Sequence, residues 1–468
     1  MTMLGTATVN LSRPAPYRLR ADEAERLTGG RWLGHPREAT IRGAAIDSRR
    51  ITPGCAFACL SGERVDGHDF AAAAVASGAA LILANRAMKV PAPVLVVHNV
   101  AAALATLAAD FRSRITGCTW IAVAGANGKT TTKELIAAAC RAACREPVLV
   151  TSGNLNNHLG VPLTVLSLPE RARYAVVEVG SNHPGELAQL AAIVRPDIAC
   201  VVSIGPEHLE GFVDLAGVAR EECGLFAAVP TGAPALLGTF GLTDEATAQG
   251  TTADALISIA TESARGRSLT LSGLPECKLE LGLLGDHNRA NAWLALQVAM
   301  AAGVDERVAR QGLAAVHATP GRLRPLRVGT HLVIDDCYNA NPASMRAGLA
   351  VLAAHPGRRL AVLGHMGELG ASSASGHAQV GEAAARAKAA LIAVGPLALP
   401  ILAAYRAAGG SDGSLAADRQ IAADLTVAWL RAGDPATVLV KGSRSAHLED
   451  TLTNLCQAFG FRFPGGVH

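Results

Sequence analysis

Residues 122–133 read AVAGANGKTTTK and constrain the fold more than any other segment of the chain. The apolar run TWIAVA leads into this segment and favours a buried strand, whereas the alanine-rich residues after it favour a helix. The glycines between them allow backbone N–H groups to surround an anion at the positive end of the new helix. The segment therefore predicts a strand, a phosphate-binding loop and a helix, as in proteins that bind nucleoside triphosphates.

Two polar side chains of this loop have expected roles in handling ATP. Lys129 is expected to neutralise the terminal phosphates, and Thr130 to offer its hydroxyl to magnesium. The spacing is GxxGKT, because Val123 stands where the GxxxxGK[ST] form has a glycine, and a chance GKT in an ordinary strand-to-helix turn is the alternative. The residues expected to bind the nucleotide here are Gly125, Ala126, Asn127, Gly128, Lys129, Thr130 and Thr131.

The 468 residues are enough for about three domains, each with its own core. Strand patterns alternate with helical patterns, which predicts an α/β fold with mostly parallel sheets. We expect a small α/β domain over residues 1–115, a central P-loop ATPase domain over 116–317 and a Rossmann-like domain over 318–468. The strands expected in the second and third domains are 120–124, 174–179, 198–203, 331–336, 358–364, 391–395 and 437–442.

Composition excludes several classes of protein. The net charge is only +3 and no basic cluster with interleaved aromatic residues occurs, so we expect no nucleic-acid partner. The longest apolar run, about residues 71–84, is too short for a membrane span, and the N-terminal residues lack the apolar core of a signal peptide. The cysteines lack zinc-site spacing and are expected to be reduced, buried thiols. We therefore expect a cytoplasmic protein.

Two further residues are expected at the edge of the central sheet that carries the phosphate loop. Glu178 ends the apolar strand YAVVEV, and His208 follows the next strand, IACVVSI, in the loop GPEHLEGF. The carboxyl ends of parallel strands are where α/β sheets bind ligands, so both side chains are candidates for holding metal. A strand-end charge and a hydrogen-bonded loop histidine are the simpler readings.

Ordered motifs across the whole chain resemble the Mur ligase family. They are the segments 47–70, 153–166 (GNLNNHLGVPLTVL), 178–186 (EVGSNHPGE), 207–212 (EHLEGF), 285–292 (GDHNRANA), 320–322 (PGR), 335–345 (DDCYNANPASM) and 440–445 (VKGSRS). In this family the phosphate loop has the form GxxGKT, in agreement with the spacing noted above.

The resemblance implies ATP-dependent ligation of D-alanyl-D-alanine to UDP-N-acetylmuramoyl-tripeptide through an acyl phosphate, by a monomer. The peptide carboxylate and the γ-phosphate of ATP are both anions, so cations must bring them together. By resemblance Lys129, Glu178 and His208 are catalytic, and Thr130, Glu178 and His208 hold magnesium.

The resemblance also assigns binding roles to polar residues in the three domains. Those expected to bind nucleotide are Asn288, Asn291, Arg322 and Asp336, and those expected to bind the dipeptide or its carboxylate are Asn339, Asn341, Lys441 and Arg444. Ser48 and Arg49, in the segment 47–70 that resembles the family's UDP-binding segment, are expected to bind the UDP group of the substrate. Four of these assignments have structural alternatives. They are helix capping for Asn288 and Asn291, an interdomain ion pair for Arg322 and Asp336, Asn-Pro turn chemistry for Asn339 and Asn341, and exposed basic turn residues for Lys441 and Arg444.

The sequence departs from the family pattern at two places. The family has a lysine, which becomes carbamylated and supports a second magnesium, where LAGVAREECGLF has glutamates. We align Glu222 with this lysine and expect its carboxylate to replace the carbamate. The alternative is that Glu221 and Glu222 are both exposed and inert. The second departure is His365 in GHMGELG, where the family pattern is GDMxELG.

Three other functions compete with this ligase. A folylpolyglutamate synthase belongs to the same superfamily, but the segments GNLNNHLG and DSR…DGHDF favour a UDP-peptide substrate. A P-loop switch protein is a second alternative and a nonenzymatic nucleotide-binding module is a third. The joint presence of Lys129, Thr130, Glu178 and His208 favours an enzyme over the last. No residue selects meso-diaminopimelate or lysine as the third residue of the peptide.

Overall fold

The computed structural model describes residues 15–34, 38–62 and 65–463. Residues 1–14, on which the expectation about a signal peptide rests, lie outside the described residues. Glu63 and Arg64, which belong to the segment 47–70, also lie outside them. In the described part of the chain, no helix is both long and apolar enough to span a bilayer.

The central domain is built on a parallel sheet with the strand order β13-β12-β11-β8-β10-β9. The three strands expected here are confirmed, and three short strands that the sequence did not reveal extend the sheet. The strands are β8 (Thr119–Ala124), β9 (Val148–Val150), β10 (Tyr174–Glu178), β11 (Ile198–Val201), β12 (Pro234–Gly238) and β13 (Ser268–Ser272).

Helices cover both faces of this sheet, which explains why β8 is apolar throughout. Ile121 and Val123 face a core made with α4 (Lys129–Ala143), α11 (Asp286–Ala301) and α12 (Glu306–Ala314). Trp120, Ala122 and Ala124 alternate with them and face the opposite core. The helices of that second core are α3 (Val100–Arg114), α5 (Gly160–Leu166), α6 (Glu186–Val194), α8 (Leu215–Gly224), α9 (Leu242–Ala248) and α10 (Ala253–Ser263).

The C-terminal domain contains a second sheet of six strands, in the order β14-β15-β19-β16-β17-β18, among the described residues. Only β14 runs antiparallel to its neighbour, and the four strands expected here are confirmed. Its strands are β14 (Arg324–Val328), β15 (His331–Asp336), β16 (Arg358–Gly364), β17 (Ala390–Val394), β18 (Gly413–Ala416) and β19 (Ala436–Lys441). Its helices are α13 (Pro342–Ala353), α14 (Ser373–Arg386), α15 (Leu399–Ala407), α16 (Arg419–Arg431) and α17 (Glu449–Ala458).

The N-terminal domain has a sheet in the order β2-β7-β6-β5-β4 and a separate antiparallel pair, β1 and β3. Its strands are β1 (Tyr17–Arg20), β2 (Arg31–Leu33), β3 (Glu38–Ile41), β4 (Ala44–Ala45), β5 (Ala56–Ala58), β6 (Leu81–Ala84) and β7 (Val94–Val96). Its described residues also form the short helices α1 (Ala21–Thr28) and α2 (Ala71–Ala76). The apolar run 71–84 is therefore α2 followed by β6.

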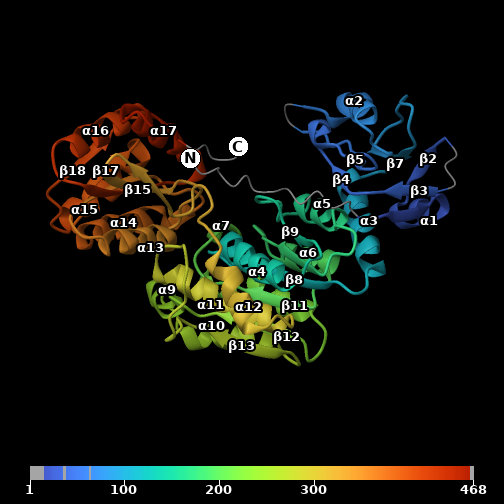
Figure 1. The fold of residues 1–468 in the computed structure, drawn as a ribbon, viewed down its shortest axis with the longest axis horizontal. Coiled ribbons are helices and arrows are strands. Elements are labelled where there is room, and N and C mark those ends of the chain that lie inside the picture. The colour runs from blue at the N-terminus through green and yellow to red at the C-terminus, as the bar shows by residue number, and fades with distance from the viewer. Residues whose placement is uncertain (1–14, 35–37, 63–64, 464–468) are drawn as a thin grey trace.

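The central domain lies between the other two, which sit at separate places along it (Figure 1). Helix α3 joins the first domain to the second by packing on α5 and α6, and Arg112 donates hydrogen bonds to the carbonyls of Val194 at 2.8 Å and Arg195 at 2.7 Å. The three large sheets fall within the three predicted ranges 1–115, 116–317 and 318–468, whose exact boundaries stay a prediction.

Candidate active site

Three neighbouring strands of the central sheet end at one place. The P-loop follows β8, Glu178 ends β10 on one side of it, and Ser203 follows β11 on the other. Glu178 is the cross-strand partner of Val123, which lies two residues before the loop. Because the strand order reverses around β8, this edge is the switch point at which parallel α/β sheets bind ligands.

Contacts from both sides fix the shape of the P-loop. The hydroxyl of Ser203 accepts a hydrogen bond from the N–H of Asn127 at 2.9 Å and donates to its carbonyl at 3.0 Å. Gly128 has a φ of 82°, and a Cβ there would lie 2.9 Å from Nδ2 of Asn291. Glycine is thus required at this position by both backbone conformation and space. The loop then enters α4, as the sequence predicted.

Lys129 is held inside the loop. Its Nζ donates to the carbonyl of Gly125 at 2.5 Å and lies 3.5 Å from Oε2 of Glu207. Burial lowers the pKa of Lys129, but the nearby carboxylates of Glu207, Glu222 and Glu178 raise it by more. The ammonium group is therefore protonated, and its side chain is largely buried although it lines the cleft described below.

Glu178 is the centre of a second cluster beside Lys129. One carboxylate oxygen accepts from the Thr130 hydroxyl at 3.0 Å and the other from Nδ2 of Asn156 at 2.9 Å. Nζ of the fully buried Lys133 lies 3.7 Å away. Neither Asn156 nor Lys133 was singled out from the sequence. Asn156 lies within GNLNNHLG, a motif that was recognised, whereas Lys133 carries no signal beyond its place one helical turn after Lys129.

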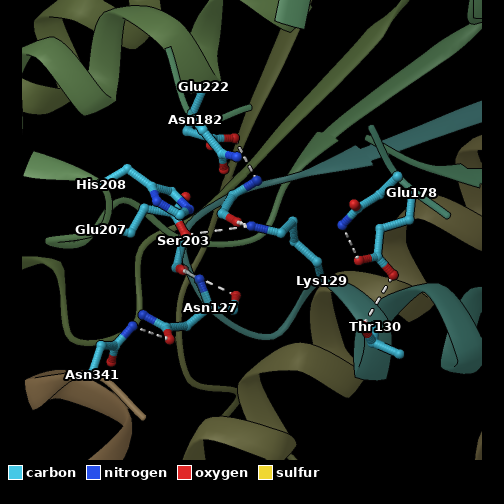
Figure 2. A network of polar contacts seen from close by, with 12 residues as sticks. Asn127, Lys129, Thr130, Glu178, Asn182, Ser203, Glu207, His208, Glu222 and Asn341 are labelled. Carbon is cyan, nitrogen blue, oxygen red and sulfur yellow. Dashed lines mark hydrogen bonds and ion pairs between the residues drawn. The ribbon is translucent and has the colours of Figure 1, made fainter. Parts of the chain in front are cut away.

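Glu207 and Glu222 form a buried pair of carboxyl groups on the other side of Lys129 (Figure 2). Oε2 of Glu222 accepts a hydrogen bond from the N–H of Gly125 at 2.6 Å. One oxygen of each residue, Oε1, has no hydrogen-bond partner among the described residues. Burial is the largest cause that raises the pKa of both groups. The expectation, in that alternative, of an exposed Glu222 is therefore wrong.

Glu221, the neighbouring candidate, has a different environment. Its two carboxylate oxygens accept hydrogen bonds from the N–H groups of Gly185 and Leu187, both at 2.8 Å, at the start of α6. A carboxylate at this place satisfies N–H groups that have no partner within the helix. Glu221 thus caps α6, while Glu222 contacts the P-loop.

His208 precedes the short helix α7 (Leu209–Phe212) with a left-handed φ of 46°. Its Nδ1 lies 3.1 Å from a carboxylate oxygen of Glu368, which belongs to the C-terminal domain. Burial is the main cause that lowers the pKa of His208, although Glu368 opposes it. Over the described ranges, no three His, Cys, Asp or Glu side chains form a group that could hold a metal ion. Glu178 and His208 therefore stand at separate places, on either side of Lys129 (Figure 2).

The C-terminal domain reaches the P-loop through two hydrogen bonds. Arg322 donates to the Thr130 hydroxyl at 3.0 Å, and its guanidinium lies 4.2 Å from the centre of the Tyr338 ring. Nδ2 of Asn341 donates to Oδ1 of Asn127 at 2.8 Å. The Asn341 side chain also caps α13 by accepting from the N–H of Ser344, and the N–H of Asn341 donates in return to the Ser344 hydroxyl. The Asn-Pro turn chemistry and the interdomain contact are therefore both present.

Asp336 and Lys441 are paired in the same domain. They are cross-strand partners at the ends of β15 and β19, and Nζ of Lys441 lies 2.8 Å from Oδ2 of Asp336. The lysine also donates to the carbonyl of Asn339 at 2.9 Å. Lys441 is buried, so its alternative as an exposed turn residue is wrong. Arg444 is half-exposed and lies 3.3 Å from Glu449.

A cleft of about 1020 Å³ lies between the central and C-terminal domains and gathers most of the predicted residues. Those that line it are Ala126, Asn127, Gly128, Lys129, Thr130, Thr131, Glu178, His208, Asn288, Asn291, Arg322, Asp336, Asn339, Asn341, Lys441 and Arg444. Asn288 lies in the first turn of α11 and donates to the carbonyl of Leu284 at 2.8 Å, and Asn291 donates to Oδ1 of Asn288 at 3.3 Å. Asn288 and Asn291 therefore form hydrogen bonds at the start of α11 and also line the cleft.

Gly125, Glu222, Ser48 and Arg49 do not line this cleft. Gly125 and Glu222 lie beneath it, joined by the hydrogen bond described above. Ser48 and Arg49 lie in the N-terminal domain, in the 3-10 turn Ser48–Arg50, which Asp47 caps. Arg49 is exposed and its guanidinium lies 2.8 Å from Asp47. Any joint action of these residues with the cleft thus needs a substrate that extends from one domain to the other.

Comparison with protein families gives three matches along the chain. Residues 40–112 match the profile described as "Mur ligase family, catalytic domain", residues 123–299 match "Mur ligase middle domain", and residues 321–444 match "Mur ligase, glutamate ligase domain". The matches cover most of the sequence and follow the same order as its three sheets.

Individual relatives agree with these matches. The UDP-N-acetylmuramoyl-tripeptide–D-alanyl-D-alanine ligase of Escherichia coli strain K12 is 36% identical over 89% of this chain and 94% of its own length. The structure of MurF from Acinetobacter baumannii superposes with a TM-score of 0.81 at 30% identity, covering 94% of this chain and 99% of that one. MurF from Thermotoga maritima in complex with ADP gives a TM-score of 0.74 at 25% identity, covering 90% and 98%. Profile matches in all three domains and relatives that span nearly the whole sequence make this chain a member of the Mur ligase family.

Proposed function

We propose that this protein is the ATP-dependent ligase that joins D-alanyl-D-alanine to UDP-N-acetylmuramoyl-tripeptide, which gives the UDP-muramyl-pentapeptide of peptidoglycan synthesis. The relatives from Escherichia coli and, by its MurF name, Acinetobacter baumannii support this assignment over a folylpolyglutamate synthase. The observation that carries the proposal is the cleft, in which the P-loop faces polar residues of the C-terminal domain. A phosphate-activating site and an acceptor site can thus share one enclosed volume.

The chemistry begins with attack of the tripeptide carboxylate on the γ-phosphate of ATP, which forms an acyl phosphate and releases ADP. Two unit charges about 4 Å apart repel by about 4 kcal/mol at an effective dielectric constant near 20. The buried ammonium of Lys129 offsets this repulsion, since it is already protonated and held by the carbonyl of Gly125. The dipeptide amine then attacks the acyl carbon and phosphate leaves. Enclosure by the two domains limits hydrolysis of the acyl phosphate.

Magnesium is part of this proposal. Thr130 and Glu178 provide hard oxygen ligands next to the loop. His208 lines the cleft, and Glu222, which is buried beneath the cleft, has one oxygen, Oε1, without a hydrogen-bond partner among the described residues. Magnesium keeps several waters and uses phosphate oxygens as ligands, so one or two protein ligands at each site are sufficient. We assign one site to Thr130 and Glu178, and a second to His208 and Glu222, whose carboxylate replaces the carbamate. When bound, magnesium would neutralise phosphate charge.

The remaining assignments extend the proposal to the substrates. Asn288, Asn291, Arg322 and Asp336 are placed on the nucleotide, because all four line the cleft together with the P-loop. Asn339, Asn341, Lys441 and Arg444 are placed on the dipeptide for the same reason. Ser48 and Arg49 are placed on the UDP group.

We further propose a cytoplasmic monomer with domain boundaries after residues 115 and 317 and with no nucleic-acid partner. The substrates, ATP and a UDP-linked peptide, are nucleotides of the cytoplasm. The sequence has no basic cluster with interleaved aromatic residues, which supports the proposal that nucleic acid is not a partner.

Steady-state ADP formation tests the proposed function. We expect ADP release to require both UDP-N-acetylmuramoyl-tripeptide and D-alanyl-D-alanine, with the pentapeptide identified by mass spectrometry. Parallel assays with the meso-diaminopimelate and the lysine tripeptides identify the third residue. ADP release that is independent of the dipeptide would instead support a hydrolase or a switch protein, and release that requires a folate would support the folylpolyglutamate alternative.

A further inference from the structure

His365 belongs to a chain of hydrogen-bonding groups that the proposed function does not yet use. It directly follows β16, and its Nε2 lies 2.9 Å from the hydroxyl of Ser445, in the loop after β19. The Ser445 hydroxyl in turn lies 3.0 Å from that of Ser443. The backbone N–H of Ser443 donates to the carbonyl of His365 at 3.0 Å, which fixes the two loops together. The imidazole is therefore held at a defined position behind the Ser445 hydroxyl.

This chain of groups ends at the cleft. Ser443 and Ser445 line the cleft that also contains Lys129 and the P-loop, while His365 is not among its lining residues. The arrangement places a hydroxyl between the cleft and a titratable ring. A hydroxyl in this position can accept a proton on its cleft side while it donates its own proton to Nε2.

The groups around His365 favour a neutral imidazole. Burial lowers the pKa of His365, and His377 of α14 lowers it further. Nε2 of His377 accepts a hydrogen bond from the N–H of Met366 at 3.0 Å, and its Nδ1 lies 2.7 Å from the carbonyl of Ser373, so the His377 ring is held in place beside the end of β16. Arg444 of the facing 3-10 turn and His447, which directly follows the turn, lie 3.3 Å and 3.5 Å from Oε1 of Glu449. Nε2 of His365 is thus available to accept a proton.

The second half of the reaction requires such an acceptor. When the dipeptide amine attacks the acyl carbon, the new C–N bond leaves the nitrogen positively charged, and one proton must leave before the C–O bond to phosphate breaks. We propose that this proton passes to the Ser445 hydroxyl while the Ser445 proton passes to Nε2 of His365, so that His365 is the proton acceptor of the aminolysis step. The imidazolium then returns its proton to water. This inference rests on the proposed function, since it assigns the base of that reaction.

The test replaces His365 by asparagine, which retains a hydrogen-bonding amide but cannot take up a proton. We expect kcat for pentapeptide formation to fall by about 10²- to 10⁴-fold, the usual range for loss of a general base, with the KM for ATP unchanged. In the unmodified enzyme kcat should fall as the pH decreases through the pKa of His365, and this acid limb should be absent from His365→Asn. Ser445→Ala should have a similar effect on kcat, and the double variant should lose little more.

A partial reaction separates this role from damage to the fold. Hydroxylamine is a weakly basic amine whose adduct releases its proton to water, so it should convert the acyl phosphate to a hydroxamate at nearly the same rate in His365→Asn as in the unmodified enzyme. His355→Asn, a change in the same domain at a histidine bonded to the carbonyl of Val351, is the matched control and should keep both kcat and the acid limb.

The outcomes are distinguishable. If the unmodified enzyme forms no pentapeptide, the proposed function fails. If the unmodified enzyme is active but His365→Asn retains its kcat and its acid limb, only the role of His365 is overturned. Loss of hydroxamate formation in His365→Asn would also overturn it, because the variant would then affect acyl phosphate formation.

Discussion

The carboxylate of Glu222 accepts a 2.6 Å hydrogen bond from the backbone N–H of Gly125, the first glycine of the P-loop. The two residues lie far apart in the sequence, and the bond connects α8 directly to the loop that handles phosphate. The other carboxylate oxygen, Oε1, has no hydrogen-bond partner in the part of the chain that the structure describes. Glu222 can thus stabilise the loop and still offer an oxygen on its other side. The carbamate of a carbamylated lysine in the same place would likewise have two oxygens, one to accept from the loop N–H and one to face a metal ion.

Glu222→Gln should lower kcat and weaken the apparent affinity for magnesium by about 10- to 100-fold, the range found when groups around a metal site are altered. The amide oxygen can still accept from Gly125, but the negative charge is lost. Titration of activity with magnesium measures the effect. Activity of the unmodified enzyme should not respond to bicarbonate, since a glutamate needs no carbon dioxide.

Glu221→Gln is the matched control for this prediction. Glu221 caps α6 through Gly185 and Leu187, so its replacement should cost about 0.5–2 kcal/mol of stability and leave the magnesium dependence unchanged. Full activity of Glu222→Gln at limiting magnesium would show that the second metal is held by other groups.

Lys129→Ala should reduce ligation by at least about 10³-fold, because the cation that stabilises the transferred phosphoryl group is lost. It should also destabilise the protein, by up to about 3–5 kcal/mol, since Glu207 and Glu222 would remain buried without their cation. Lys278→Ala, at an exposed position that does not line the cleft, is the control.

The pH dependence of this loss follows from the raised pKa values of the two glutamates. Their folded pKa values lie above the unfolded value of 4.5, so ionising them costs stability as the pH rises above that value. The difference in melting temperature between Lys129→Ala and the unmodified protein should therefore be smallest near pH 4.5 and grow with pH. A difference that shrinks as the pH rises would contradict the assigned charges.

Ser48→Ala combined with Arg49→Ala should raise the KM for UDP-N-acetylmuramoyl-tripeptide by about tenfold or more and leave the KM for ATP unchanged. The two residues lie in the N-terminal domain, outside the cleft, and Arg49 is held by Asp47 with its side chain exposed. Arg50→Ala, in the same turn, serves as the control. Equal changes in both KM values would argue against UDP recognition here.

The elements that depend on local sequence were predictable. The strand, loop and helix around Lys129 follow from a short run of residues, and the long apolar strands of the two six-stranded sheets were found at nearly their observed bounds. The short strands β9, β12 and β13 were missed, since β9 has only three residues and β13 is a partly exposed edge strand without a clear alternation.

Contacts between domains were not predictable. Arg322 lies 192 positions from Thr130 in the sequence, and Asn341 lies 214 positions from Asn127, so their hydrogen bonds depend on how two folded domains dock. The burial of Lys441 was missed for a similar reason, because it follows from the register of β19 with β15. The motifs identified the residues of the cleft, but not which of them bond to one another.

Val213 provides a test of strain in the loop between α7 and α8. It is a β-branched residue with a φ of 70° and a ψ of −54°, and its side chain is 83% exposed. Such residues rarely adopt positive φ, and the conformation costs about 1–3 kcal/mol. Val213→Gly should therefore stabilise the protein by about 1 kcal/mol net, because glycine relieves the strain at a smaller entropic cost and no packing is lost. Val213→Ala keeps the Cβ atom and should recover much less. Thermal unfolding of the two variants measures this difference, and a lower melting temperature for Val213→Gly than for Val213→Ala would show that the loop is not strained at this residue.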